Sequence, residues 1–342
     1  MRVNQPKALG AGLVALDLVV SPDPMVPVQA WAGGTTGNVM AILAWHGWDS
    51  YPLARMNGDP ASERVRADLR RWGVKLELAA CTPTSNTPII VQEIRRTAGG
   101  TPTHRFSWAC LRCGGWLPPF KPITQHVVEY AEAFVPGTSV FFFDRVSRGT
   151  ITLASMAADA GAVVFFEPSG RGDERLFAEA LELAHVVKYA DERICDLADA
   201  IPSKNRVLEV QTLGAAGLRF RTPNRKRGGD GWRALEAVIA ERIVDSCGSG
   251  DWCSAGVIAT TASEGLDGLL RLNITGIKDA LMYGQKLAAW NCGFEGARGG
   301  MYSSSSIESP IRLGMRRSAA AIQPSGAPGE GSLIQCPKCD VA

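Results

Sequence analysis

The sequence predicts an α/β protein with a doubly wound, mostly parallel sheet flanked by helices. The main observation is that short apolar runs alternate with amphipathic segments through the middle of the chain. Buried strands of a parallel sheet give continuous apolar runs, and the crossovers between them are usually helices. A length of 342 residues suffices for one large α/β domain, alone or with an appendage.

The N-terminal third of the chain predicts two strands and two helices. Residues 8–20 alternate apolar and small side chains and predict one strand with Asp17 near its far end. A glycine-rich turn at residues 33–38, which ends in Asn38, opens a compact helix. Residues 51–72 then predict a strand followed by an amphipathic helix.

A β-hairpin and a strand–helix series follow. Residues 87–96 and 104–108 alternate with a period of two around a Thr-Ala-Gly-Gly-Thr turn. The later strands and helices are expected at 140–144, 150–161, 162–167, 176–183, 185–189 and 206–213. Polar or glycine-rich residues follow each of these strands, so ligand-binding loops are expected at the carboxyl edge of the sheet.

Composition excludes several classes of protein. Lys and Arg number 36 against 34 Asp and Glu, so we expect neither nucleic acid nor a membrane surface as partner. Asp17 interrupts the N-terminal apolar run that would otherwise mimic a signal peptide. No run approaches the roughly 18 apolar residues of a membrane span. We therefore expect a cytoplasmic protein.

The stretch from Asp245 to Asp251, D-S-C-G-S-G-D, is the strongest functional feature of the chain. The apolar run before it predicts a strand, and a helical pattern follows it. The glycines allow a sharp turn with converging N–H groups, and the helix N-terminus adds about half a positive charge. We expect Gly248, Ser249 and Gly250 to bind a transferring phosphoryl group while Asp251 accepts the proton of the attacking hydroxyl. The alternative without chemistry is a glycine turn capped by an aspartate.

This heptad resembles the D-T-x-G-A-G-D motif of the ribokinase/PfkB carbohydrate kinase family. Other parts of that family's pattern follow in order over residues 8–302, including G-G-x-x-x-N and T-x-G-x-x-G turns. The resemblance implies a ribokinase-like kinase core over residues 1–315, with a small β-stranded lid from segments near 14–32 and 86–116. Lid strands in this family often pair between subunits, so a homodimer through the lid is also expected.

The resemblance further implies three groups of ligand-binding residues. The residues expected at the sugar substrate are Asp17, Gly33, Gly34, Asn38 and Arg105. The residues expected at ATP are Thr212, Gly214, Gly217, Asp245 and Asn291. The family's N-x-x-E magnesium motif is altered here at residues 190–193, and the carboxylates that would replace it for Mg²⁺ are Glu167 and Glu192.

Two Cys-x-x-Cys pairs are an addition that the family does not normally carry. The pairs are Cys110 with Cys113, and Cys336 with Cys339 at the end of a 316–342 tail whose composition predicts a flexible linker. Such pairs form the knuckles of four-cysteine zinc sites. We expect a structural Zn²⁺, with four free thiols as the alternative.

The expected function is therefore an ATP-dependent kinase that phosphorylates a hydroxymethyl group of a small sugar. A nucleoside kinase is the alternative within the same family. A catalytically inactive protein that senses a sugar or a nucleotide is the alternative from a different class.

Overall fold

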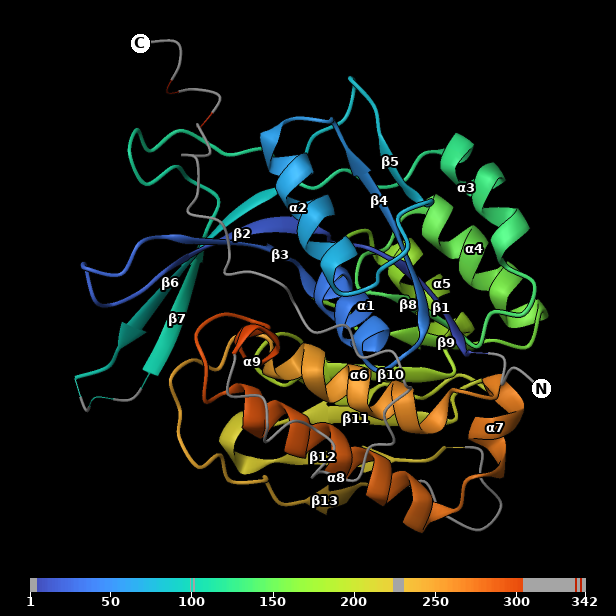
Figure 1. Ribbon diagram of the computed structural model, residues 1–342. Coiled ribbons are helices and arrows are strands. Elements are labelled where there is room, and N and C mark those ends of the chain that lie inside the picture. The colour runs from blue at the N-terminus through green and yellow to red at the C-terminus, as the bar shows by residue number, and fades with distance from the viewer. Residues whose placement is uncertain are drawn as a thin grey trace.

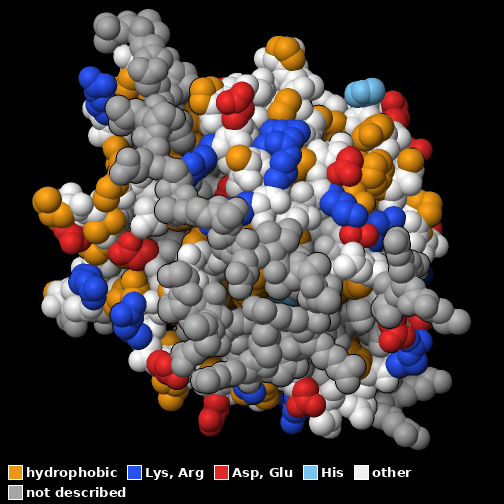
Figure 2. Space-filling model, in the orientation of Figure 1, with side chains coloured by type: hydrophobic (Ala, Val, Ile, Leu, Met, Phe, Trp, Pro, Cys, Tyr) orange, Lys and Arg blue, Asp and Glu red, His pale blue; other side chains and the backbone are white. Residues whose placement is uncertain are grey.

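The computed structural model describes residues 5–98, 100, 102–223, 231–303, 336 and 339. The expected linker and most of the 316–342 tail lie outside these residues. On the face shown in Figure 2, the described basic and acidic side chains are interspersed. No helix in the described ranges is both long and apolar enough to cross a lipid bilayer.

A nine-stranded sheet in the order β13-β12-β11-β10-β9-β8-β1-β4-β5 forms the centre of the molecule (Figure 1). The strands are β1 (Lys7–Ala11), β4 (Asp49–Met56), β5 (Ala79–Cys81), β8 (Val140–Phe143), β9 (Val163–Phe166), β10 (Val186–Ala190), β11 (Leu208–Thr212), β12 (Leu218–Arg221) and β13 (Arg233–Leu235). Among the described strands of this sheet, every pairing is parallel except β11 with β12 and β12 with β13. The prediction of a mostly parallel sheet is confirmed.

Helices cover both faces of the sheet, as a doubly wound fold requires. One face carries α1 (Thr35–Trp45), α2 (Pro60–Arg71), α6 (Ser249–Thr261), α7 (Gly265–Arg271) and α8 (Ile274–Asn291), and the other carries α3 (Gln125–Ala131), α4 (Arg148–Asp159) and α5 (Glu174–Leu183). Strand β8 shows why both faces are apolar, because Val140 and Phe142 pack into one core and Phe141 and Phe143 into the other. A short helix, α9 (Gly299–Tyr302), ends the described core.

A second, four-stranded sheet projects from one side of the core (Figure 1). Its order is β3-β2-β6-β7, with β2 (Ala15–Val20), β3 (Gln29–Gly33), β6 (Ile89–Arg96) and β7 (Pro102–Ser107). The hairpin expected around residue 100 is present as β6 and β7. We call this sheet the lid sheet.

The prediction of one strand over residues 8–20 is wrong, because β1 and β2 belong to different sheets. The chain leaves the core sheet at Gly12, which has a φ of 155°. A Cβ at this position would lie 1.8 Å from Oδ1 of Asp144. The chain can therefore pass Asp144 and enter the lid only with glycine at residue 12.

The strand expected before the Asp245–Asp251 turn is also wrong, because residues 236–244 form no strand. Ile239 and Ile243 are exposed, so this apolar run is not buried in a sheet. The segment is instead tied to the end of α8, since the Val244 amide donates to the carbonyl of Cys292 at 2.7 Å.

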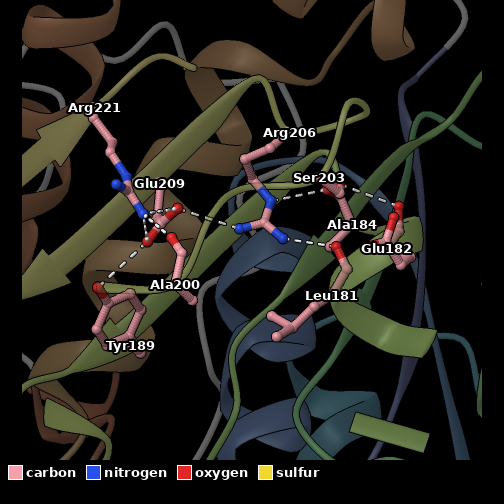
Figure 3. A network of polar contacts seen from close by, with 9 residues as sticks. All are labelled: Leu181, Glu182, Ala184, Tyr189, Ala200, Ser203, Arg206, Glu209 and Arg221. Atoms are coloured by element: carbon pink, nitrogen blue, oxygen red, sulfur yellow. Dashed lines mark hydrogen bonds and ion pairs between the residues drawn. The ribbon is translucent and has the colours of Figure 1, made fainter. Parts of the chain in front are cut away.

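A buried ion-pair network fastens β11 to its neighbours at the amino ends of the strands (Figure 3). The Arg206 guanidinium donates to the carbonyls of Leu181 and Ala184 at the end of α5, where free carbonyls need donors. Glu209 lies 3.4 Å from Arg206 and 3.0 Å from Arg221. The network lies at the edge of the sheet opposite the candidate active site and serves the fold.

Candidate active site

The carboxyl ends of the parallel strands form one edge of the core sheet, and the candidate functional residues gather there. Asp144 follows β8 and Glu167 follows β9, while Lys188 lies near the end of β10. The N-terminus of α6 meets this edge, because the Lys188 Nζ donates to the carbonyl of Gly250 at 3.1 Å. This is the position at which open α/β sheets bind ligands.

The turn before α6 adopts the backbone that an anion site requires. Gly248 is left-handed, with a φ of 74°, and a Cβ there would lie 2.3 Å from the carbonyl oxygen of Ala297. Among the described residues, no acceptor contacts the amides of Gly248, Gly250 and Asp251. The Ser249 amide, expected as a further donor, instead bonds the Ser246 carbonyl at 3.2 Å within the turn. The free donors are therefore Gly248, Gly250 and Asp251.

The Asp251 carboxylate is held by a relay of side chains from distant parts of the chain. Asn38 of α1 donates from Nδ2 to Asp251 Oδ2 at 2.7 Å, and Arg298 donates from Nε to Asn38 Oδ1 at 3.0 Å. These two contacts fix the orientation of the Asn38 amide. Asn38, which was expected at the substrate, therefore makes its side-chain contacts with Asp251 and Arg298.

The environment of Asp251 makes its carboxylate more basic. Burial, reinforced by the nearby Glu167 carboxylate, raises its pKa to about 7, against the lowering effect of Asn38 and Lys188. A general base is most effective when its pKa lies near the working pH. The Asp251 carboxylate therefore lies at the N-terminus of α6 and has a pKa that suits a general base.

Glu167 and Lys188 form a buried ion pair beside the turn. Glu167 accepts from Lys188 Nζ at 2.5 Å and from the Ser254 hydroxyl. Burial is the largest single influence and lowers the pKa of Lys188, but the neighbouring Glu167, Cys253 and Asp251 together outweigh it, so the pKa lies above its ordinary value. Lys188 is thus a fixed positive charge next to Gly250. Its signal in the sequence is a lysine inside an apolar strand, which our sequence reasoning did not use.

Of the two carboxylates expected at Mg²⁺, Glu167 lies beside the turn before α6, whereas Glu192 is exposed beyond β10. A Cβ on Gly250 would lie 3.5 Å from Glu167 Oε1, so this carboxylate faces the turn at residues 248–251, which we call the anion turn. Mg²⁺ keeps several waters and is usually bound through one or two carboxylates plus substrate phosphates. Because both Glu167 oxygens already have protein partners, a contact through a metal-bound water fits best.

A small cavity opens beneath the lid sheet beside this cluster. Its lining includes Asp17, Trp31 and Arg298. Among the described residues, the buried atoms Asp17 Oδ1 and Arg298 Nη1 have no hydrogen-bond partner. Burial also raises the pKa of Asp17 to about 6. Because unpaired buried polar atoms are costly, the cavity is suited to a ligand that supplies both a donor and an acceptor.

Gly33 and Asp68 contact two of the residues that line this cavity, Asp17 and Arg298. A Cβ on Gly33, at the end of β3, would lie 1.8 Å from Asp17 Oδ2, and Gly34 begins α1. Asp68 of α2 accepts from Arg298 Nη2 at 2.9 Å and from the hydroxyl of Tyr302 at 2.8 Å. Arg298 is therefore held rigidly, although sequence reasoning pointed neither to it nor to Asp68.

Asp245 and Asn291 were expected at the nucleotide, but their side chains form hydrogen bonds with other residues of the protein. Asp245 accepts from Gln92 of the lid at 2.5 Å and from the amides of Cys247 and Gly296, both at 2.9 Å. The Asn291 amide bonds the carbonyl of Ala297 and the N–H of Gly300 in the turn after α8. Their polar atoms thus hold the lid, the anion turn and the last turn together.

The remaining residues expected at ligands are Arg105 and the Thr212–Gly217 turn, and they lie in different parts of the molecule. Arg105 on β7 is exposed, and its neighbour His104 instead faces the turn, with Nδ1 at 3.4 Å from the Ser246 hydroxyl. Alternation along a strand places the two side chains on opposite faces of the lid. The Thr212–Gly217 turn follows β11 at the carboxyl edge of the core sheet, one strand beyond Lys188.

The chain is similar in sequence to a curated kinase and in fold to several solved sugar and nucleoside kinases. No protein-family model matches the chain. The ATP-dependent ribose-1-phosphate kinase of Halopiger xanaduensis is 28% identical over 312 residues, which cover 85% of this chain and 94% of the relative.

Solved structures share the fold over most of their length. A fructokinase double mutant from Vibrio cholerae O395 has a TM-score of 0.66 at 19% identity, covering 86% of this chain and 95% of that one. Ribokinase from Giardia lamblia has a TM-score of 0.65 at 15% identity, with coverages of 86% and 95%. The Burkholderia thailandensis nucleoside kinase in complex with inosine has a TM-score of 0.63 at 16% identity, with coverages of 91% and 98%. The predicted fold class is confirmed.

Proposed function

We propose that this chain, a kinase by its resemblance to the ribokinase/PfkB family, transfers the γ-phosphoryl group of ATP to a hydroxymethyl group of a small sugar. The expected resemblance is confirmed, since the relative and the neighbours named above are sugar or nucleoside kinases. The acceptor and the residues that act on it are our proposal.

The observation that carries the proposal is the pairing of a basic carboxylate with free backbone donors at one helix N-terminus. Asp251 takes the proton of the acceptor hydroxyl as the new O–P bond forms and the bond to the leaving ADP oxygen breaks. The amides of Gly250 and Asp251, with the Gly248 amide before them, face the negative charge that is spread over the phosphoryl oxygens. Lys188 adds a fixed positive charge on the same side.

The cavity beneath the lid is the proposed sugar site. Ionised Asp17 can accept hydrogen bonds from two sugar hydroxyls, and Arg298 Nη1 can donate to a sugar oxygen. The ribose-1-phosphate kinase relative makes a pentose or its phosphate the first candidate for the substrate.

The proposed nucleotide site follows the edge of the core sheet from the anion turn to residues 212–217. A Mg²⁺ ion held by the nucleotide phosphates supplies further charge neutralisation when bound. Glu167 would contact that ion through water, and the lid sheet would exclude bulk water from the reacting groups.

ADP release and product mass measured across a small substrate panel test the proposal. With ATP and Mg²⁺, we expect turnover with at least one of ribose, ribose 1-phosphate and fructose, with a phosphorylated sugar as product. Turnover with inosine alone would replace the sugar kinase by a nucleoside kinase. Binding of sugar and ATP without turnover on any acceptor would identify an inactive sensing protein and overturn the proposal.

A further inference from the structure

The two Cys-x-x-Cys pairs, which the phosphotransfer site does not use, meet in space. The Sγ atoms of Cys110, Cys113, Cys336 and Cys339 all lie within 4.8 Å of one another. Cys110 lies 3.8 Å from Cys339, and Cys113 lies 3.8 Å from Cys336. None of the four cysteines forms a disulfide. The sequence separation of more than 220 residues makes this a tertiary cluster.

The spacing of the sulfur atoms matches a tetrahedral metal site. Zinc–thiolate bonds of about 2.3 Å place the corners of a regular tetrahedron about 3.8 Å apart. The two cross-pair distances have this value, and the remaining distances stay within 4.8 Å. An ion at the centre would thus bind all four sulfurs with little rearrangement.

The backbone around the first pair already solvates thiolates. The Arg112 amide donates to Cys110 Sγ and the Gly115 amide donates to Cys113 Sγ, each at 3.4 Å. The Cys110 amide also bonds the carbonyl of Gly115 at 2.8 Å, which closes the turn. Hydrogen bonds of this kind orient metal ligands and stabilise their negative charge.

We propose that these four cysteines bind one structural Zn²⁺ ion within a single chain. Four thiolates in a tetrahedron suit zinc and leave no open position for a substrate, so the ion is structural rather than catalytic. Cys110 follows the end of β7 at Ser107 by three residues. The metal therefore ties the C-terminal end of the chain to the base of the lid sheet. Binding releases the thiol protons and involves no redox step.

Elemental analysis of protein purified without chelators tests this site. We expect about one zinc per chain in the wild type, and a mass of protein plus one zinc in native mass spectrometry of the monomer. Cys339→Ser and Cys113→Ser should each reduce the zinc content at least tenfold. Cys195→Ser, which changes an exposed cysteine outside the cluster, is the matched control and should keep its zinc.

Cobalt substitution gives a second readout that does not depend on a variant folding. Co²⁺ added to metal-free wild type should produce the visible absorption of a tetrahedral tetrathiolate site, and zinc should abolish it. Asp251→Asn should retain its zinc, so a failed kinase assay and a failed metal assay are distinguishable. Wild type that binds neither zinc nor cobalt, or Cys339→Ser with the zinc content of wild type, would overturn the proposal.

Discussion

Substitution of Asp251 by Asn separates the catalytic role of this residue from its effect on the fold. The amide keeps the size of the side chain and an oxygen that can accept from Asn38, but it cannot take up a proton. Loss of a positioned general base typically lowers kcat by about 10²- to 10⁴-fold, which corresponds to about 3 to 5 kcal/mol of transition-state stabilisation.

The same substitution should stabilise the folded protein at neutral pH. The pKa of Asp251 is raised from 3.8 to about 7, so the folded state disfavours the ionised carboxylate. At about 1.36 kcal/mol per pKa unit, this costs about 4 kcal/mol above pH 7. Because Asp251 is half-buried, solvent reduces the expected gain to about 1–3 kcal/mol. The sign follows from linkage: wild-type stability falls as pH rises from about 4 to 7, and the variant lacks this fall.

The assay combines steady-state kinetics with urea unfolding at pH 5 and pH 8. We expect a large loss of kcat, retained ATP binding and a stability gain that is greater at pH 8. Asp279→Asn makes the same chemical change at an exposed position of α8, beyond the first turn of that helix, and should leave both quantities unchanged. Full turnover by Asp251→Asn would refute its assignment as the base, and a gain independent of pH would refute the electrostatic reasoning.

Three further predictions concern Asp251, Gly248 and Arg206. The wild-type kcat/KM should rise with pH and level off above about 7, since the free enzyme needs an unprotonated Asp251; a flat profile between pH 5 and 8 would contradict this. Gly248→Ala should destabilise the protein by about 1–3 kcal/mol because of its positive φ. Its kcat/KM should fall at least tenfold, because the added Cβ meets the Ala297 carbonyl, and wild-type kinetics would show that the turn is dispensable. Arg206→Ala should lower the free energy of unfolding by about 3 kcal/mol in urea, with kcat/KM per folded molecule unchanged.

Local sequence patterns were sufficient to predict most of the core elements. Apolar runs and helical periodicity located β8 to β11 and the helices between them, because each element buries a continuous face. Both wrong predictions came from interpreting an apolar stretch as a single buried strand. One apolar stretch was divided between two sheets at Gly12, and another, which contains Ile239 and Ile243, is exposed. A pattern of hydrophobicity does not show which sheet a strand joins, or whether an apolar run is buried at all.

The candidate site was predicted where its residues lie in one short segment and missed where they come from distant segments. Gly248, Gly250 and Asp251 lie together in one turn that the sequence itself contains. Arg298 contacts Asn38 across 260 residues, and no local pattern marks that contact. Asp245 was expected at the nucleotide because it lies in the same heptad, but its burial lets it bond Gln92 of the lid.

A crystal structure with ADP, Mg²⁺, an aluminium fluoride analogue of the phosphoryl group and the sugar that supports turnover tests the central claim most directly. We expect fluorine atoms of the analogue within hydrogen-bond distance of the Gly250 and Asp251 amides. We also expect the acceptor hydroxyl within hydrogen-bond distance of the Asp251 carboxylate. A phosphoryl analogue bound away from the α6 N-terminus, or an acceptor hydroxyl out of reach of Asp251, would contradict the claim.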